Sequence, residues 1–339
     1  MRKFFSALLC VTLCALSLTG CAPREPEPDG FLIVASIYPV YITLLNLTDG
    51  VSGVEAQLMA ETSTGCLHDY TLLPGDMKKL EKADLFVING AGMEGFLDRV
   101  VADIPGLHTL DASADIPLLS AADDHEDHEH EEHDHDHDHE DEEGDHEHET
   151  DAHDHEHEGH DQEHDHADMP NPHVWTSVNR YIMQVENITA GLCAADPTHA
   201  ALYERNRDAY IAELKTLKAE MSAKIALRSD LRIITFHEAF EYLAEDFGLT
   251  VEAVMESEPN QSPSPRRLAE LIGIVRERGI SAIFVEPQYN DATGKVIAAE
   301  TGCVLLTLDP IVTGARDKAA YLEGMRKNAE TLMSDGGKG

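Results

Sequence analysis

Short apolar segments alternate with amphipathic ones along most of the chain. Apolar runs predict strands at residues 31–36, 54–59 and 84–89 in the first half, and at 232–236, 250–255, 281–286 and 304–308 in the second. Helical spacing and helix-start residues predict helices at 40–47, 74–82, 177–195, 238–247, 265–278, 291–300 and 318–333. Because strands that alternate with helices form βαβ units, the pattern predicts an α/β protein with two lobes, each built on a parallel sheet.

One predicted helix is much longer than the others. Residues 198–228 contain no Gly or Pro, and Asp196 and Pro197 form a strong helix start before them. Apolar residues follow helical spacing along it, at Tyr203, Tyr210, Leu214, Leu217, Met221 and Ile225. At 1.5 Å per residue such a helix spans ~48 Å. We therefore expect residues 197–228 to be a rigid helix that links an N-terminal lobe (31–196) to a C-terminal lobe (229–339).

An acidic, histidine-rich segment interrupts the first lobe at residues 121–168. Its 48 residues contain 25 Asp or Glu, 15 His and no Lys or Arg. A segment with so few apolar residues cannot bury enough surface to offset the entropy of ordering, so we expect a disordered loop. Imidazoles interleaved with carboxylates bind borderline divalent metals, which favours a low-affinity metal-binding loop over a merely solubilising one. Its histidines are His125, His128, His130, His133, His135, His137, His139, His146, His148, His153, His155, His157, His160, His164 and His166.

The charge of the chain argues against a nucleic-acid-binding function. The formal net charge is −39, of which the acidic segment contributes −25. Without the first 20 residues, the charge outside that segment is −16. Such a surface repels a polyanion, and no basic patch offsets it.

The N-terminus has the three parts of an export signal. Arg2 and Lys3 are positive, residues 4–18 are mostly apolar, and small residues precede Cys21. The 17 residues from 4 to 20 are short for a membrane span, which argues against a transmembrane anchor. The ending Leu-Thr-Gly-Cys resembles a bacterial lipobox, which implies removal of residues 1–20 as a signal peptide and lipid attachment to Cys21. Residues 21–30, rich in Pro and Glu, would then be a tether outside the cytoplasmic membrane.

Three cysteines remain after this processing, namely Cys66, Cys193 and Cys303. An odd number outside the cytoplasm permits at most one internal disulfide, and the sequence does not determine which two would pair.

Four residues outside the acidic segment are candidates for a metal site. His68 follows the second predicted strand, His173 precedes a helix, and His237 follows the strand at 232–236. Asp309 follows the strand at 304–308. Any one of them alone would be read as a hydrogen-bonded loop residue. All four, however, fall in loops or at strand ends, where a ligand-binding cleft between α/β lobes forms. The histidines at 108 and 199 are assigned to structural positions.

Seven groups of residues occur in a fixed order along the chain. They are His68-Asp69-Tyr70, Pro74-Gly75-Asp76, Ala83-Asp84 with Asn89-Gly90 and Met93-Glu94, Pro172-His173-Val174-Trp175, Phe236-His237-Glu238-Ala239-Phe240, Val285-Glu286-Pro287-Gln288 and Leu308-Asp309-Pro310. In this order they resemble the motifs of zinc-binding lipoproteins of ABC importers, the ZnuA-like members of the zinc and manganese solute-binding family. The resemblance covers about residues 31–333 and implies two α/β lobes joined by one long helix.

The resemblance also implies a ligand set, namely His68, His173, His237 and Asp309. Three imidazoles and one carboxylate suit a closed tetrahedral zinc site. Manganese-type members carry a carboxylate where this chain has His237, so the nitrogen ligand favours Zn²⁺ over Mn²⁺.

One departure from the family pattern concerns an additional carboxylate ligand. Cys66 and Leu67 stand where zinc members often have acidic residues, so the resemblance leaves such a ligand open. Glu286, at the end of a predicted strand, is a candidate for supporting a ligand from behind.

The function that the resemblance implies is not enzymatic. It is capture of Zn²⁺ outside the cytoplasm and delivery to an ABC permease driven by its ATPase. Four protein ligands leave no open coordination position, which argues against a zinc hydrolase. Two alternatives stay open, namely a manganese-specific protein of the same family and a surface zinc buffer or adhesin without a transporter. We expect a monomer, held at the outer face of the cytoplasmic membrane by the lipid on Cys21.

Overall fold

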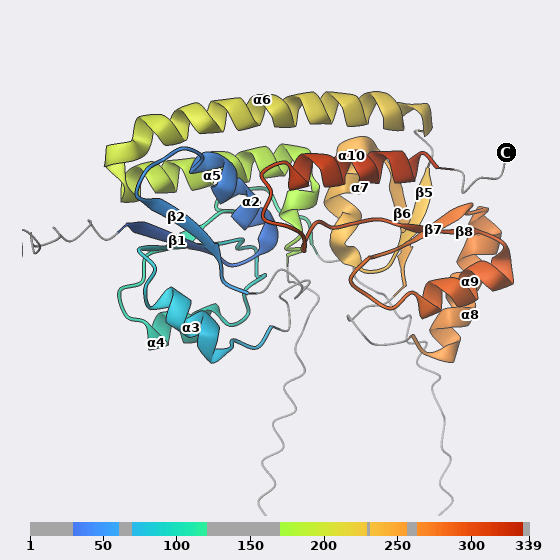
Figure 1. Ribbon diagram of the computed structural model, residues 1–339. Coiled ribbons are helices and arrows are strands. Elements are labelled where there is room, and N and C mark those ends of the chain that lie inside the picture. Colours follow the sequence, from blue (N-terminus) through green and yellow to red (C-terminus); the bar gives the residue numbers. More distant parts are fainter. Residues whose placement is uncertain (1–29, 61–69, 121–169, 229–230, 256–262, 335–339) are drawn as a thin grey trace, which may run out of the picture.

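The computed structural model describes residues 30–60, 70–120, 170–228, 231–255 and 263–334. In these residues the chain forms two α/β lobes, each with a four-stranded sheet whose paired strands are all parallel (Figure 1). The predicted fold class is therefore confirmed. None of the helices within these ranges is long and apolar enough to cross a membrane.

The first lobe has the strand order β2-β1-β3-β4. Its strands are β1 (Phe31–Ala35), β2 (Val54–Leu58), β3 (Leu85–Ile88) and β4 (Thr109–Asp111). Its helices are α2 (Tyr38–Leu47), α3 (Pro74–Leu80), α4 (Leu97–Asp103) and α5 (Val178–Ala195), and a 3-10 turn, η2 (Val174–Thr176), precedes α5. Every residue of β3 is buried, as expected for an inner strand of a parallel sheet. The sequence pattern missed α4, because seven residues are too few to establish a helical period.

The second lobe repeats this plan with the order β6-β5-β7-β8. Its strands are β5 (Arg232–Thr235), β6 (Thr250–Val254), β7 (Ala282–Val285) and β8 (Val304–Thr307). Its helices are α7 (Glu241–Phe247), α8 (Pro265–Arg278), α9 (Ala292–Thr301) and α10 (Ala320–Leu332), with a 3-10 turn, η5 (Glu238–Phe240), before α7. The helix predicted at 238–247 thus begins as a 3-10 turn.

The predicted long helix is α6 (Ala200–Ile225), extended at its two ends by the 3-10 turns η3 (Pro197–His199) and η4 (Ala226–Arg228). All six apolar residues predicted from spacing are buried. The carboxylate of Asp196 does not cap a backbone N–H but binds the His199 ring (2.6 Å) and the Tyr203 hydroxyl (2.8 Å).

The long helix does not connect the lobes alone. Helix α5 of the first lobe and α10 of the second both pack against α6 (Figure 1). A single cluster of buried apolar residues includes Leu44 of α2, Tyr210 of α6, Phe240 beside α7 and Tyr321 of α10. The two lobes therefore share part of their hydrophobic core, which resists a wide hinge motion between them.

Candidate metal centre

Two of the predicted ligands, His173 and His237, meet in the interior between the lobes. His173 is fully buried and precedes η2, while His237 is 3% exposed and lies just after β5. Their Nε2 atoms are 3.1 Å apart, and the rings lie edge to face with centroids 4.8 Å apart. Two buried imidazoles from different lobes thus present the same ring nitrogen to each other.

Each of these rings is oriented by an oxygen behind it. The Nδ1 atom of His173 lies 2.9 Å from Oδ1 of Asn171, and Nδ1 of His237 contacts Oε1 of Glu286. An amide or carboxylate oxygen accepts a hydrogen bond, so each neutral ring carries its proton on Nδ1. With this proton arrangement both Nε2 atoms direct a lone pair at the other ring, and a separation of 3.1 Å then requires a proton or a cation between them, as at a metal-binding pair of histidines.

Glu286 is a buried carboxylate, and no Lys or Arg side chain of the described residues forms an ion pair with it. It follows β7 and is 2% exposed. Burial raises the pKa of Glu286 above its usual value, and the adjacent His237 opposes this shift. Within the described residues, the Oε2 atom of Glu286 has no hydrogen-bond partner. A buried carboxylate oxygen left unpaired is costly, and a bound cation next to His237 would lower that cost.

Asp309 lies at the same edge of the second sheet but in a different bonding arrangement. It follows β8, and β5, β7 and β8 lie side by side in the sheet. Because these strands are parallel, the residues that follow them, His237, Glu286 and Asp309, lie at the same edge. Its Oδ1 atom accepts from the backbone N–H of Ile311 (2.8 Å) and lies 3.4 Å from Nε2 of Gln288. Among the described residues, no group of three or more His, Cys, Asp or Glu side chains is placed to hold a metal ion. Asp309 is therefore near the strand end expected for it, but it is not assembled with the two histidines.

The turn after Asp309 is strained and firmly held. Ile311 is 4% exposed and has φ of 60°, a left-handed conformation that is rare for a β-branched residue. The indole N–H of Trp175 donates to the carbonyl of Pro310 at 2.7 Å, and Tyr321 Oη donates to the carbonyl of Trp175 at 2.7 Å. Trp175 thus connects the segment of His173 to the segment of Asp309.

A second set of contacts positions His173 from within the first lobe. Glu94 accepts hydrogen bonds from Ser36 Oγ (2.6 Å) and from the backbone N–H groups of Asn89 (2.8 Å) and Gly90 (3.0 Å). Asn89 in turn donates to the carbonyl of Pro172 at 2.9 Å. Burial raises the pKa of Glu94 from 4.5 to about 7, against the effect of these hydrogen bonds. The Asn-Gly and Met-Glu pairs noted in the sequence therefore support the backbone beside His173.

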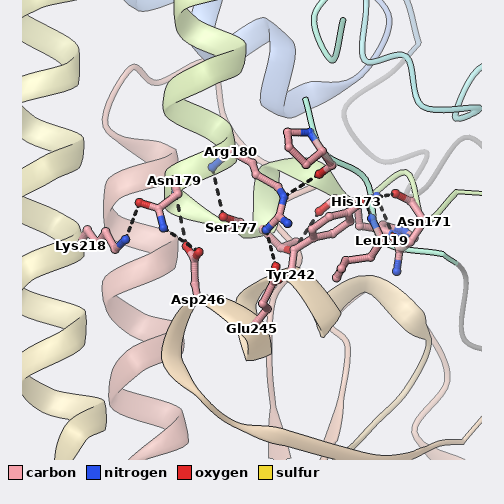
Figure 2. A network of polar contacts seen from close by, with 12 residues as sticks. Leu119, Asn171, His173, Ser177, Asn179, Arg180, Lys218, Tyr242, Glu245 and Asp246 are labelled. Atoms are coloured by element: carbon pink, nitrogen blue, oxygen red, sulfur yellow. Dashed lines mark hydrogen bonds and ion pairs between the residues drawn. The ribbon is translucent and has the colours of Figure 1, made fainter. Parts of the chain in front are cut away.

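Polar contacts also cross from this region to α7 of the second lobe (Figure 2). The Tyr242 hydroxyl donates to the carbonyl of Asn171 (2.6 Å) and accepts from the N–H of Leu119 (3.0 Å). Arg180 binds Glu245 at 2.6 Å. Ser120 and Pro170, which flank residues 121–169, pair as an isolated antiparallel bridge, and their neighbours Leu119 and Asn171 both contact Tyr242 of α7.

Several predicted residues fall outside the described ranges. These are His68, the 15 histidines of the acidic segment, Cys66 and the lipid-attachment candidate Cys21. Of the remaining cysteines, Cys193 and Cys303 are both free thiols, so they do not pair with each other. His199 binds Asp196 at the start of α6, in the structural position expected for it.

Sequence reasoning missed Asn171 and Glu241 as parts of the site. Asn171 is fully buried, and Nδ2 of its amide donates to the Glu238 carbonyl (2.7 Å) and to Oε2 of Glu241 (3.0 Å). Burial raises the pKa of Glu241 from 4.5 to about 8. Asn171 could have been suspected from its place two residues before His173, but nothing in the local sequence points to Glu241.

Comparisons with known proteins find relatives along most of this chain. Residues 33–334 match the family model ZnuA, described as "Zinc-uptake complex component A periplasmic". The chain is 31% identical to the zinc-binding lipoprotein AdcA of Streptococcus pneumoniae, over 98% of this chain and 60% of that protein, so it spans about three-fifths of that relative's length. It is 28% identical to the high-affinity zinc uptake system protein ZnuA of Bacillus subtilis, over 98% of each chain.

Solved structures show the same architecture. The SBP FpvC of Pseudomonas aeruginosa, in complex with Mn²⁺, superposes with a TM-score of 0.71 at 26% identity, over 89% of this chain and 97% of that one. A crystal structure of ZnuA superposes with a TM-score of 0.67 at 23% identity, over 90% of this chain and all of that one, and shares the fold.

Proposed function

We propose, because this chain belongs to the ZnuA family of periplasmic zinc-uptake components, that it captures Zn²⁺ outside the cytoplasm and delivers it to an ABC-type importer. The family is one of solute-binding proteins, whose role is not enzymatic. In this proposal the cation is cargo, and it binds between the two lobes.

The buried pair of imidazoles carries the proposal. A tetrahedral zinc ion with Zn–N distances of about 2.05 Å separates two ligand nitrogens by about 3.3 Å. The Nε2 atoms of His173 and His237 are already 3.1 Å apart, and both rings are oriented from behind. The separation of these two nitrogens is therefore close to that expected for two ligands of one zinc ion, which supports the proposal.

His68 and Asp309 complete the proposed ligand set. Asp309 contributes a negative charge to the site, and Glu286 contributes a second one behind His237. Two carboxylates offset the charge of a divalent cation in an interior where an unpaired charge would be costly.

Selectivity for Zn²⁺ follows from the chemistry of the ligands. Imidazole nitrogens suit zinc, whereas Mn²⁺ prefers sites richer in oxygen. With His237 as the third imidazole, the site is a nitrogen-rich one, and we propose that it prefers Zn²⁺ to Mn²⁺.

Around this tight site we propose two accessory features. The histidines of residues 121–168 bind further zinc ions weakly and raise the local concentration of the metal near the cleft. A lipid on Cys21 holds the protein at the outer face of the membrane, within reach of the permease and its ATPase. Because the lobes share a core cluster and both pack on α6, release rests on small tilts and loop shifts rather than on wide opening.

Calorimetric titration with Zn²⁺ tests the ligand set. The mature chain lacking residues 123–166 should bind one ion tightly, and His237→Ala and Asp309→Ala should each bind it measurably but far more weakly. His199→Ala is the matched control, because His199 binds Asp196 at the start of α6 and should not affect the metal. Tight binding by both ligand variants would refute the assignment.

Transport itself needs a separate test. Genes for a permease and an ATPase beside this gene, and loss of growth in zinc-poor medium when the gene is deleted, are the expected results. Normal growth under zinc limitation would instead favour a surface zinc buffer or adhesin.

A further inference from the structure

The side chain of Asn171 makes four hydrogen bonds, two to each lobe. Its Oδ1 atom accepts from the backbone N–H of His173 (2.9 Å) and faces Nδ1 of the same residue (2.9 Å). Its Nδ2 atom donates to the carbonyl of Glu238 (2.7 Å) and to Oε2 of Glu241 (3.0 Å). Both of the last two acceptors belong to the second lobe.

The direction in which this amide points decides the chemistry of His173. With Oδ1 toward the ring, the ring must carry its proton on Nδ1, which leaves the lone pair of Nε2 for a metal. With the amide reversed, Nδ2 would donate to Nδ1, the proton would move to Nε2, and that atom could not bind a cation. The orientation of an amide follows from its partners, so the tautomer depends on the backbone N–H of His173, which donates to Oδ1, together with the two acceptors that face Nδ2.

We propose that Glu241 is a positioning residue for metal binding: by accepting from Nδ2 of Asn171 across the lobe interface, it holds His173 in the tautomer that binds the ion. The other acceptor is the backbone carbonyl of Glu238, which every residue type provides. The Glu241 acceptor belongs to a side chain, so a substitution at this position removes or keeps the hydrogen bond to Asn171. The proposal rests on the proposed function in one respect, namely that His173 is a metal ligand.

The surroundings of Glu241 support this role over a purely structural one. Within the described residues its Oε1 atom is buried and has no hydrogen-bond partner. A buried oxygen without a partner lowers the free energy of unfolding, so stabilising the fold does not explain this carboxyl group. Apart from a hydrogen bond from its own backbone N–H, the carboxyl group of Glu241 contacts the amide of Asn171. The Oε2 atom accepts from the amide whether the carboxyl group is ionised or carries a proton on Oε1.

The test compares four forms of the full mature chain: the parent, Glu241→Leu, Glu241→Gln and Glu245→Leu. Gln retains a side-chain oxygen that can accept from Asn171, and Leu removes it. Glu245 is the matched control, because it lies one turn further along α7 and also binds across the lobe interface, to Arg180 at 2.6 Å, without touching Asn171. If Glu241→Leu does not fold, Glu241→Ala removes the acceptor without adding apolar bulk.

The first measurement needs no metal. Long-range proton–nitrogen spectra of the ¹⁵N-histidine-labelled protein at pH 8 report the tautomer of His173, whose signals are assigned by their loss in His173→Gln. We expect the Nδ1–H form alone in the parent, in Glu241→Gln and in Glu245→Leu, and a mixture of tautomers in Glu241→Leu. The second measurement is the dissociation constant of the first Zn²⁺ equivalent, by competition with a chromophoric chelator, which we expect Glu241→Leu to raise roughly 10-fold.

The outcomes separate this proposal from the proposed function. If the parent does not bind Zn²⁺ tightly, the proposed function fails whatever the tautomer. If the parent binds tightly and Glu241→Leu keeps both the tautomer and the affinity, the role of Glu241 is refuted. An equal loss of affinity in Glu245→Leu would also refute it, since the effect would then come from a weaker lobe interface.

Discussion

The contact between Trp175 and Pro310 predicts that the segment of His173 and the segment of Asp309 hold each other in position. Trp175 is 1% exposed, and its indole N–H donates to the buried Pro310 carbonyl at 2.7 Å. Trp175→Phe leaves that carbonyl without this donor, which costs about 1–3 kcal/mol. The smaller ring also leaves unfilled volume, and we take about 1–2 kcal/mol for it, well below the cost of a full truncation to Ala. The expected loss in free energy of unfolding is therefore ~2–5 kcal/mol.

Urea unfolding followed by far-UV circular dichroism measures this loss. Tryptophan fluorescence is unsuitable, because Trp175 is the only Trp in the chain. Tyr210→Phe is the control for stability alone. The Tyr210 hydroxyl donates to Tyr181 at 3.3 Å in the buried core, and among the described residues it is not hydrogen-bonded to the segments of His173 or Asp309. We expect Tyr210→Phe to lower stability without changing zinc affinity.

A double-mutant comparison then tests whether Trp175 acts through Asp309. If the indole holds the Asp309 turn in place, Trp175→Phe should weaken zinc binding in the parent and have no further effect in Asp309→Ala. Equal weakening in both backgrounds would show that Trp175 acts by another route. A change in stability below about 0.5 kcal/mol would contradict the estimate from burial and hydrogen bonding.

Two further predictions concern the acidic segment and a buried carboxyl group. Removing residues 123–166 should abolish the additional zinc equivalents seen by calorimetry while one tight site remains, and loss of the tight site as well would contradict the proposed division between loop and cleft. Glu94→Gln should change how stability depends on pH. Burial raises the pKa of Glu94 from 4.5 to about 7, so the folded chain holds this proton more tightly than the unfolded chain. The parent should therefore lose roughly 3 kcal/mol relative to Glu94→Gln as pH rises from 4 to 8, and a constant difference in unfolding midpoints across that range would refute this.

The sequence by itself determined most of the secondary structure and the place of the strand-end residues. Strands and helices have different apolar periods, so the spacing from Tyr203 to Ile225 was enough to predict which face of α6 is buried. A parallel sheet puts the residues that follow its strands at one edge. For this reason the sequence alone predicts that His237, Glu286 and Asp309 lie near one another. Resemblance to a family added the expected ligand set.

Only the tertiary structure decided how the ligands are held. The contacts of Asn171 with Glu241 and of Trp175 with Pro310 join residues 70 and 135 positions apart. Hydrogen bonds of this kind depend on how the two lobes pack, and no local pattern shows which residue will pair with which. The same packing leaves Asp309 bonded to its own turn rather than assembled with the two histidines. Periodicity is a property of residues that are close along the chain. The tautomer of a buried imidazole, in contrast, depends on which atom the fold places within hydrogen-bonding distance of its Nδ1, and that atom can come from any part of the sequence.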